Sequence, residues 1–128
     1  MNPKKILIVD DEVDLVETLR FPLEIEGYHV LVAHNGEDAL NQARKENPDL
    51  ILLDLMLPKL DGYKVCRLLK FDERYKHIPI LMLTAKTQEK DKVLGMDTGA
   101  DEYITKPFEM DDLIKKVKEY LSKLDSGK

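Results

Sequence analysis

Short apolar runs alternate along the chain with segments of helical periodicity, and this alternation limits the fold more than any other feature. Uninterrupted apolar runs are typical of parallel strands, because such strands are buried on both faces of their sheet. The runs that predict strands are 6–9, 28–33, 50–53, 78–83 and the shorter 102–104. The segments that predict helices are 13–26, 36–46, 62–71, 88–98 and 110–124. Five successive βα units with right-handed crossovers predict an α/β fold, a doubly wound five-stranded parallel sheet with helices on both faces.

Turn and capping residues agree with this division of the chain. Gly27 and Gly99 stand where helices are expected to end, and Pro48 follows the second helix. Asn35, three residues before Asp38, is typical of a helix N-terminus, because its side chain can accept a hydrogen bond from a free backbone N–H. The turn and capping residues therefore support the same helices as the hydrophobic periodicity does.

A length of 128 residues suits one domain that can bury a proper core. We expect a single domain over 1–124 and a C-terminal tail at 125–128. Hydrophobic residues make up 43% of the chain, which argues against intrinsic disorder. The apolar run 6–9 is too short for a signal peptide or a membrane span, so we predict a cytoplasmic protein that does not bind a membrane.

The charge balance argues against one class of partner. The chain has 20 Lys and Arg against 25 Asp and Glu, a net charge of −5. Affinity for a phosphate backbone needs clustered Lys and Arg, so we expect no direct nucleic-acid binding by this domain. The single cysteine, Cys66, cannot form an internal disulfide and is interpreted as a small buried hydrophobe.

Chemically selective residues follow the predicted strands at their carboxyl ends, where ligands bind in sheets of this kind. Asp10 and Asp11 follow the first strand, Asp54 the third, Thr84 the fourth and Lys106 the fifth. Three carboxylates in one small volume repel each other unless a cation lies among them. Oxygen ligands favour Mg²⁺, with Mn²⁺ as an alternative, and such an ion usually completes its shell with a phosphate oxygen. Lys106 and Thr84 would supply a cation and a donor for that phosphate.

Each of these residues also has a purely structural interpretation. Asp10 and Asp11 can stabilise the N-terminus of the following helix, since acidic residues are favoured in the first turn. Lys106 can be an ordinary ion-pair partner of Asp54, and Thr84 can be a turn residue. Their common position at one end of the predicted sheet favours a shared site.

The same residues belong to motifs that resemble a receiver domain of bacterial two-component response regulators, of the kind found in chemotaxis regulators. The matching segments are ILIVDDE at 6–12, LLDLMLP at 52–58 with Asp61–Gly62, LTA at 83–85 and GADEYITKPF at 99–108. The intervals match as well, because Thr84 lies thirty residues and Lys106 fifty-two residues beyond Asp54. The resemblance covers essentially the whole chain and implies a flavodoxin-like sheet of order 2-1-3-4-5.

The resemblance also implies roles for the site residues. Asp54 would be the phosphoacceptor, attacking a phosphoryl group carried by a histidine. Asp11, Asp54 and the backbone carbonyl of Met56 would bind Mg²⁺, while Asp10 would act mainly through a bound water. Lys106 would offset the charge that builds on the phosphoryl oxygens during transfer.

A conformational switch is implied at the fourth and fifth strands. Thr84 would hydrogen-bond the attached phosphoryl group, and Tyr103 would rotate inward, which would remodel the face formed by helix 88–98, the fifth strand and the last helix. In this family the Lys106–Pro107 bond is cis, and X-Pro is the bond at which the cis form is cheap.

The partners implied are a sensor histidine kinase or a histidine phosphotransfer protein, and a downstream protein or effector domain. Leu15, Thr18 and Pro22 form an apolar stripe on the first helix where the family receives its kinase. Pro22 also predicts a kink, because proline removes a helical hydrogen bond. We expect a monomer before phosphorylation and leave dimerisation on phosphorylation open.

The predicted function is a phosphorylation-activated signalling switch that assists its own phosphorylation and dephosphorylation and is not a turnover enzyme. Two alternatives on the same fold remain. A metal-dependent phosphohydrolase would use Asp54 as nucleophile but would need a further acid or base group. A docking module would bind partners without being phosphorylated.

Overall fold

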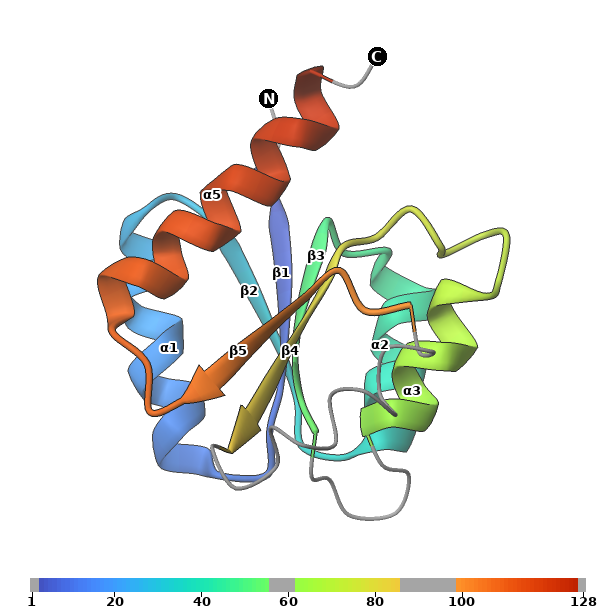
Figure 1. Cartoon of the computed structure of the whole chain (residues 1–128), viewed down its shortest axis with the longest axis horizontal. Coiled ribbons are helices and arrows are strands. Elements are labelled where there is room, and N and C mark those ends of the chain that lie inside the picture. The colour runs from blue at the N-terminus through green and yellow to red at the C-terminus, as the bar shows by residue number, and fades with distance from the viewer. Residues whose placement is uncertain (1–2, 56–61, 86–98, 127–128) are drawn as a thin grey trace.

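The computed structural model describes residues 3–55, 62–85 and 99–126, and it confirms the predicted α/β fold. Five strands form one sheet of order β2-β1-β3-β4-β5, and every neighbouring pair is parallel (Figure 1). The strands are β1 Lys5–Val9, β2 His29–Ala33, β3 Leu50–Asp54, β4 Ile80–Ala85 and β5 Glu102–Lys106. The described helices are α1 Val13–Ile25, α2 Gly36–Glu46, α3 Gly62–Lys70 and α5 Met110–Ser126. The helix predicted at 88–98 lies outside the described residues.

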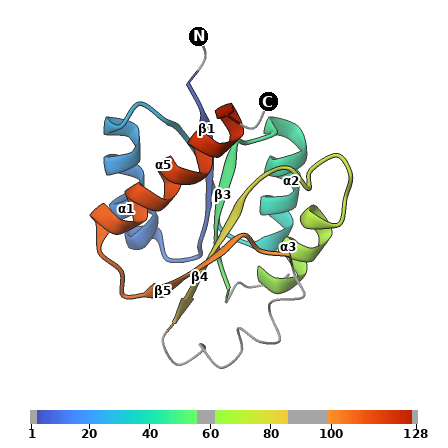
Figure 2. The same cartoon turned by 45° about the horizontal axis from the view of Figure 1, so that its top comes forward.

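Helices cover both faces of the sheet. α1 and α5 lie on one face, and α2 and α3 lie on the other (Figures 1 and 2). Successive strand residues point to opposite faces, which explains why the strands are apolar without interruption. The strand residues buried under α1 and α5 are Ile6, Ile8, Val30, Leu50, Leu52, Leu81 and Leu83. The strand residues buried under α2 and α3 are Leu7, Val9, Ala33, Ile51, Leu53, Ile80 and Met82.

The fourth strand is displaced along the chain from its predicted position at 78–83. Ile78 belongs to a turn, in which its backbone N–H donates to the carbonyl of Tyr75. Pro79 has no N–H to donate, so regular pairing begins only at Ile80. The periodicity of an apolar run locates a strand but not the residue at which its ladder begins.

Three strands, β3, β4 and β5, also extend further toward their carboxyl ends than predicted. Asp54 pairs with Leu83 in the parallel register, and Thr84 pairs with Thr105. Asp54, Thr84 and Lys106 are therefore strand residues, not the first residues after a strand as the sequence suggested. Backbone pairing holds each of them in place.

The predicted helix ends at Gly27 and Asn35 are confirmed. Gly27 has a φ of 98°, and its N–H donates to the carbonyl of Glu24 while that of Tyr28 donates to Leu23, a Schellman arrangement. The Asn35 side chain accepts a hydrogen bond of 2.9 Å from the backbone N–H of Asp38.

The ends of α1, α3 and α5 differ from the prediction by one or two residues, and Pro22 lies inside α1. α1 continues through Pro22 to Ile25, and the expected kink stays a prediction. α5 continues to Ser126, two residues beyond the predicted end at 124 and into the expected tail. The domain boundary at 124 stays a prediction. Among residues 3–55, 62–85 and 99–126, no helix is both long and apolar enough to cross a membrane.

We expect Asn35→Ala to lower the free energy of unfolding by about 1 kcal/mol, because the N–H of Asp38 loses its acceptor. A loss of that size should lower Tm by about 4 °C in a domain of this length. Asn41→Ala, at an exposed position inside the same helix, is the matched control and should keep or slightly raise Tm. Thermal melts followed by circular dichroism test this, and equal melting temperatures for the two variants would contradict the capping role.

Candidate functional site

The carboxyl ends of β1, β3 and β5 bring the predicted site residues to one edge of the sheet. Asp10 follows β1 directly, Asp54 ends β3, and Lys106 ends β5. β1 and β3 are neighbours in the sheet, although β2 lies between them in the sequence. Strand order reverses at this place, which is where sheets of this class bind ligands.

Asp10 is a fully buried carboxylate with a partner for each oxygen. Its Oδ1 accepts a hydrogen bond of 2.9 Å from the backbone N–H of Glu12, and its Oδ2 lies 3.3 Å from Nζ of Lys106. Its backbone is also held, because its N–H donates to the carbonyl of Ala33 and its carbonyl accepts from Nδ1 of His34 at 3.0 Å. Such a carboxylate is fixed before any ligand arrives.

Lys106 is the counter-charge of the carboxylate cluster. Its Nζ lies 3.3 Å from Asp10, 3.4 Å from Oδ1 of Asp54 and 3.9 Å from Oε1 of Glu12, and its side chain is only 21% exposed. Burial opposes the charged form of Lys106, but the carboxylates of Asp54 and Asp10 outweigh burial and raise its pKa. The ammonium therefore stays charged and shared between two strands.

Asp10, Asp11 and Asp54 together form a set of oxygen ligands. One carboxylate oxygen from each lies within 4.8 Å of the others. Asp10 and Asp54 are buried while Asp11 is exposed, so the cluster is open on one side. An all-carboxylate set of this size fits a hard divalent cation that keeps waters of its own. The fourth predicted ligand, the carbonyl of Met56, lies outside the described residues.

Thr84 provides a second sign that the site is built for a ligand. It is completely buried in β4, and its Oγ1 has no hydrogen-bond partner among the described parts of the chain. An unsatisfied buried hydroxyl costs about 1–3 kcal/mol. The hydroxyl is therefore available to a group that none of the described residues supplies.

The second predicted switch residue, Tyr103, lies half-buried in β5. It packs against the core cluster under α2 and α3, and it pairs in register with Met82. The Lys106–Pro107 peptide bond is cis, as the resemblance implied. The predicted inward rotation of Tyr103 stays a prediction.

The stripe predicted to receive a kinase has mixed exposure. Leu15 and Pro22 are partly buried, whereas Thr18 is exposed and donates its hydroxyl hydrogen to the carbonyl of Asp14 at 2.8 Å. Val16, Leu19 and Leu23, on a neighbouring face of α1, are buried in the core between the sheet and the helices α1 and α5. The partner face stays a prediction.

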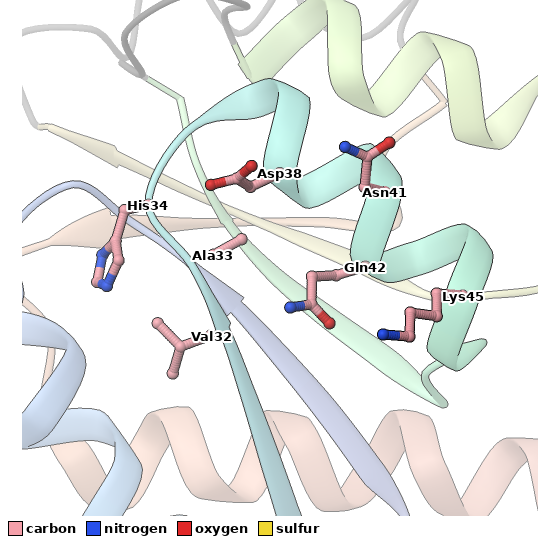
Figure 3. A pocket seen from close by; sticks show the side chains of 7 residues that line it. All are labelled: Val32, Ala33, His34, Asp38, Asn41, Gln42 and Lys45. Atoms are coloured by element: carbon pink, nitrogen blue, oxygen red, sulfur yellow. The ribbon is translucent and has the colours of Figure 1, made fainter.

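A separate hollow lies between the edge strand β2 and α2 (Figure 3). Its lining residues are Val32, Ala33, His34, Asp38, Asn41, Gln42 and Lys45. None of the predicted site residues lines this hollow, although His34 holds the carbonyl of Asp10. The carboxylate cluster, not this hollow, is the candidate functional site.

Sequence patterns did not predict two hydrogen bonds of the site, from Glu12 to Asp10 and from His34 to Asp10. The backbone N–H of Glu12 caps the Asp10 carboxylate two residues back, an Asx-type turn that an aspartate at a strand end can signal. The contact between His34 and Asp10 joins residues far apart in the sequence, and no local pattern announces it.

Comparison with known proteins agrees with this geometry. Residues 6–118 match the family described as Response regulator receiver domain. The chain belongs to this family. Receiver domains are phosphorylation-activated switches that bind Mg²⁺ at an acidic pocket and interact with histidine kinases and output domains.

A relative in Bacillus subtilis (strain 168) matches most of the length of this receiver domain. The alkaline phosphatase synthesis transcriptional regulatory protein PhoP is 53% identical over 118 residues, which cover 92% of this chain and 48% of PhoP. The receiver domain thus spans about half the length of this relative.

Solved structures of other receivers have the same fold. A putative response regulator from Chloroflexus aurantiacus J-10-fl has a TM-score of 0.88 at 41% identity and covers 94% of this chain and 98% of its own. Chemotaxis response regulator CheY4 of Vibrio cholerae has a TM-score of 0.85 at 32% identity, and the match covers 92% of this chain and 98% of the CheY4 chain.

We expect Thr84→Val to raise the free energy of unfolding by about 1 kcal/mol in Mg²⁺-free buffer, because valine removes an unsatisfied buried hydroxyl. Thr18→Val is the matched control, since its exposed hydroxyl has an acceptor and its loss should not stabilise the domain. Urea denaturation measures both changes. Destabilisation by Thr84→Val would show that the hydroxyl has a partner in the folded state.

Proposed function

We propose that Asp54 of this receiver domain accepts a phosphoryl group from a histidine of a sensor kinase or of a histidine phosphotransfer protein. One observation carries the proposal: the nearly buried carboxylate of Asp54 shares Lys106 with Asp10 and forms an oxygen cluster with Asp10 and Asp11. The Thr84 hydroxyl, which has no hydrogen-bond partner among the described residues, supports the proposal independently.

In the proposed step, a carboxylate oxygen of Asp54 attacks phosphorus and the bond from phosphorus to the histidine nitrogen breaks. The nitrogen leaves with the electron pair of that bond, and Asp54 becomes an aspartyl phosphate. Lys106 already lies 3.4 Å from Oδ1 of Asp54, so its ammonium is placed to offset charge on the incoming phosphoryl oxygens. The carboxylate itself is the nucleophile, so the step forms the new oxygen–phosphorus bond without a proton transfer from Asp54.

Asp10, Asp11 and Asp54 fit Mg²⁺, with Mn²⁺ as an alternative, and Met56 is proposed to add its backbone carbonyl. Bound Mg²⁺ would neutralise charge on the transferred phosphoryl group and orient it. Asp10 is proposed to act through water, because both of its oxygens already have protein partners. Asp11, the exposed member of the cluster, is proposed to bind directly.

The proposed output is a change on the β5 side of the sheet. The Thr84 hydroxyl, which lacks a partner among the described residues, would donate to a phosphoryl oxygen on Asp54. Thr84 pairs with Thr105 on β5, so a shift of Thr84 would also displace Thr105, which lies two residues from Tyr103. Tyr103 would then turn inward and alter the surface read by a downstream protein or effector domain.

The alternatives are not favoured. Membership of the receiver family argues against a phosphohydrolase and against a docking module that is never phosphorylated. The cytoplasmic location, the lack of direct nucleic-acid binding, the monomeric state before phosphorylation and the lack of enzymatic turnover stay predictions.

Incubation with acetyl phosphate and Mg²⁺ should add one phosphoryl group to the wild-type chain and none to Asp54→Asn, because the amide is not a nucleophile for this step. Asp112→Asn, which changes an exposed carboxylate on α5, is the matched control and should be phosphorylated normally. Intact-mass measurement reads the adduct, and chelation of Mg²⁺ should prevent it. An adduct on Asp54→Asn would refute the assignment of the phosphoacceptor.

Lys106→Met should have opposite effects on metal affinity and on phosphorylation. Loss of the ammonium removes a competitor for the Asp10 and Asp54 carboxylates, so Kd for Mg²⁺ should fall by about fivefold. The rate of phosphorylation by acetyl phosphate should fall by about 100-fold, because a charge near the transferred group is lost.

Isothermal titration and intact-mass time courses measure these two effects. Lys118→Met is the matched control, because Lys118 pairs with Glu26 away from the site and should change neither value. Weaker Mg²⁺ binding in Lys106→Met would show that the lysine supports the cation and does not compete with it.

A further inference from the structure

Gly62, the first residue of α3, lies against the backbone of the proposed phosphoacceptor. A Cβ atom built at Gly62 would be 2.4 Å from the carbonyl oxygen of Asp54 and 2.9 Å from both Cα and the carbonyl oxygen of Leu55. Real Cβ atoms essentially never come within 3.0 Å of a heavy atom outside their own residue and its neighbours in the chain. All three neighbours are main-chain atoms, so no side-chain rotation can relieve the contact.

The requirement for glycine at this position is spatial. Two other glycines, Gly27 and Gly99, have φ values of 98° and 84°, in the left-handed region that favours glycine. Gly62 is not in that region and begins an ordinary helix. What the position excludes is the volume of a side chain, not a side chain's backbone preference.

Hydrogen bonds fix the segment that Gly62 touches from both sides. The N–H of Gly62 donates to the carbonyl of Leu55 at 3.0 Å. The N–H of Leu55 donates to the carbonyl of Leu83 on β4, also at 3.0 Å, and Asp54 itself pairs with Leu83. The Asp54–Leu55 segment is therefore held between β4 and the start of α3.

α3 cannot easily move away to make room for a side chain. Val65, Cys66 and Leu69 are buried in the core under this face of the sheet. At the helix end, the ammonium of Lys70 donates to two backbone carbonyls and to Oδ2 of Asp101. Since the helix is anchored as well, a side chain at Gly62 would press on the Asp54–Leu55 backbone, and the Asp54 carbonyl oxygen is its nearest contact, at 2.4 Å.

We propose that Gly62 is a positioning residue for Asp54. Its missing side chain lets α3 seat directly on the Asp54–Leu55 backbone and so sets where the Asp54 carboxylate lies relative to Lys106 and to the cation cluster. The inference rests on the proposed function of Asp54. A misplacement of about 1 Å in a reacting group can lower a rate by about 100-fold.

Gly62→Ala tests the proposal, with Gly27→Ala as the matched control. Alanine at Gly27 is strained by its φ of 98°, yet its Cβ would meet no atom within 4 Å and it lies at the opposite end of β2 from the site. The control thus loses stability without touching Asp54. Circular dichroism and Tm verify folding, titration calorimetry with Mg²⁺ gives Kd, and intact mass gives the phosphorylation rate at saturating acetyl phosphate.

The expected result is a folded Gly62→Ala domain that binds Mg²⁺ about tenfold more weakly and is phosphorylated about 100-fold more slowly. Gly27→Ala should keep wild-type values for both, even at a similar loss of Tm. Wild-type Kd and rate in Gly62→Ala, or equal losses in Gly27→Ala, would overturn the proposal.

Two further outcomes are decisive as well. If Gly62→Ala does not fold even at low temperature with trimethylamine N-oxide as stabiliser, the glycine serves folding, and the positioning role is wrong. If the wild-type chain binds Mg²⁺ but takes no phosphoryl group, the proposed function fails. The Mg²⁺ dissociation constants of the two glycine variants then still decide whether Gly62 positions the Asp54 carboxylate.

Discussion

The attraction between one lysine and the carboxylates of two neighbouring strands is the interaction on which this structure depends. Asp10 is fully buried and Asp54 nearly so, and buried carboxylates are tolerated only with a counter-charge and hydrogen bonds. Lys106 supplies that charge from β5, at the edge of the sheet. It balances the cluster only in part, because one ammonium faces the three carboxylates of Asp10, Asp11 and Asp54. The remaining negative charge is what makes the site receptive to a divalent cation.

The rest of the fold serves to bring these groups to one place. Two apolar layers cover the sheet, so the strands are held rigidly and their carboxyl ends form a fixed edge. Local contacts then fix the positions of single residues. The N–H of Glu12 donates a hydrogen bond to the Asp10 carboxylate, and Gly62 lies in close contact with the Asp54 backbone. A charged site on such a frame needs little reorganisation when a ligand binds.

Among the residues that the structure describes, one buried side-chain group in this rigid frame has no hydrogen-bond partner. Thr84 is completely buried near the carboxyl end of β4, and its Oγ1 has no hydrogen-bond partner among the described residues. A phosphoryl group on Asp54 would offer that hydroxyl an acceptor. Such an acceptor would remove the cost of the unsatisfied hydroxyl, so phosphorylation would favour a state in which Thr84 is paired.

Much of the fold follows from local sequence. The apolar runs gave the five strands, and Asn35 and Gly27 gave two helix ends, because periodicity and capping depend on neighbours in the chain. Local sequence misplaced β4 by two residues and stopped α5 early, because ladder pairing and packing against other elements decide where an element ends. The motif residues Asp10, Asp11, Asp54, Thr84 and Lys106 were recognised together from their order and spacing.

The sequence by itself determined the fold class and which residue types meet at the carboxyl edge, since the carboxyl ends of parallel strands all lie at that edge. Only the tertiary structure decided which atoms are satisfied. It divides Lys106 between Asp10 and Asp54, leaves Oγ1 of Thr84 without an acceptor among the described residues, and sets Gly62 against the carbonyl of Asp54. These are contacts between residues far apart in the chain, and their distances depend on packing that no local pattern encodes.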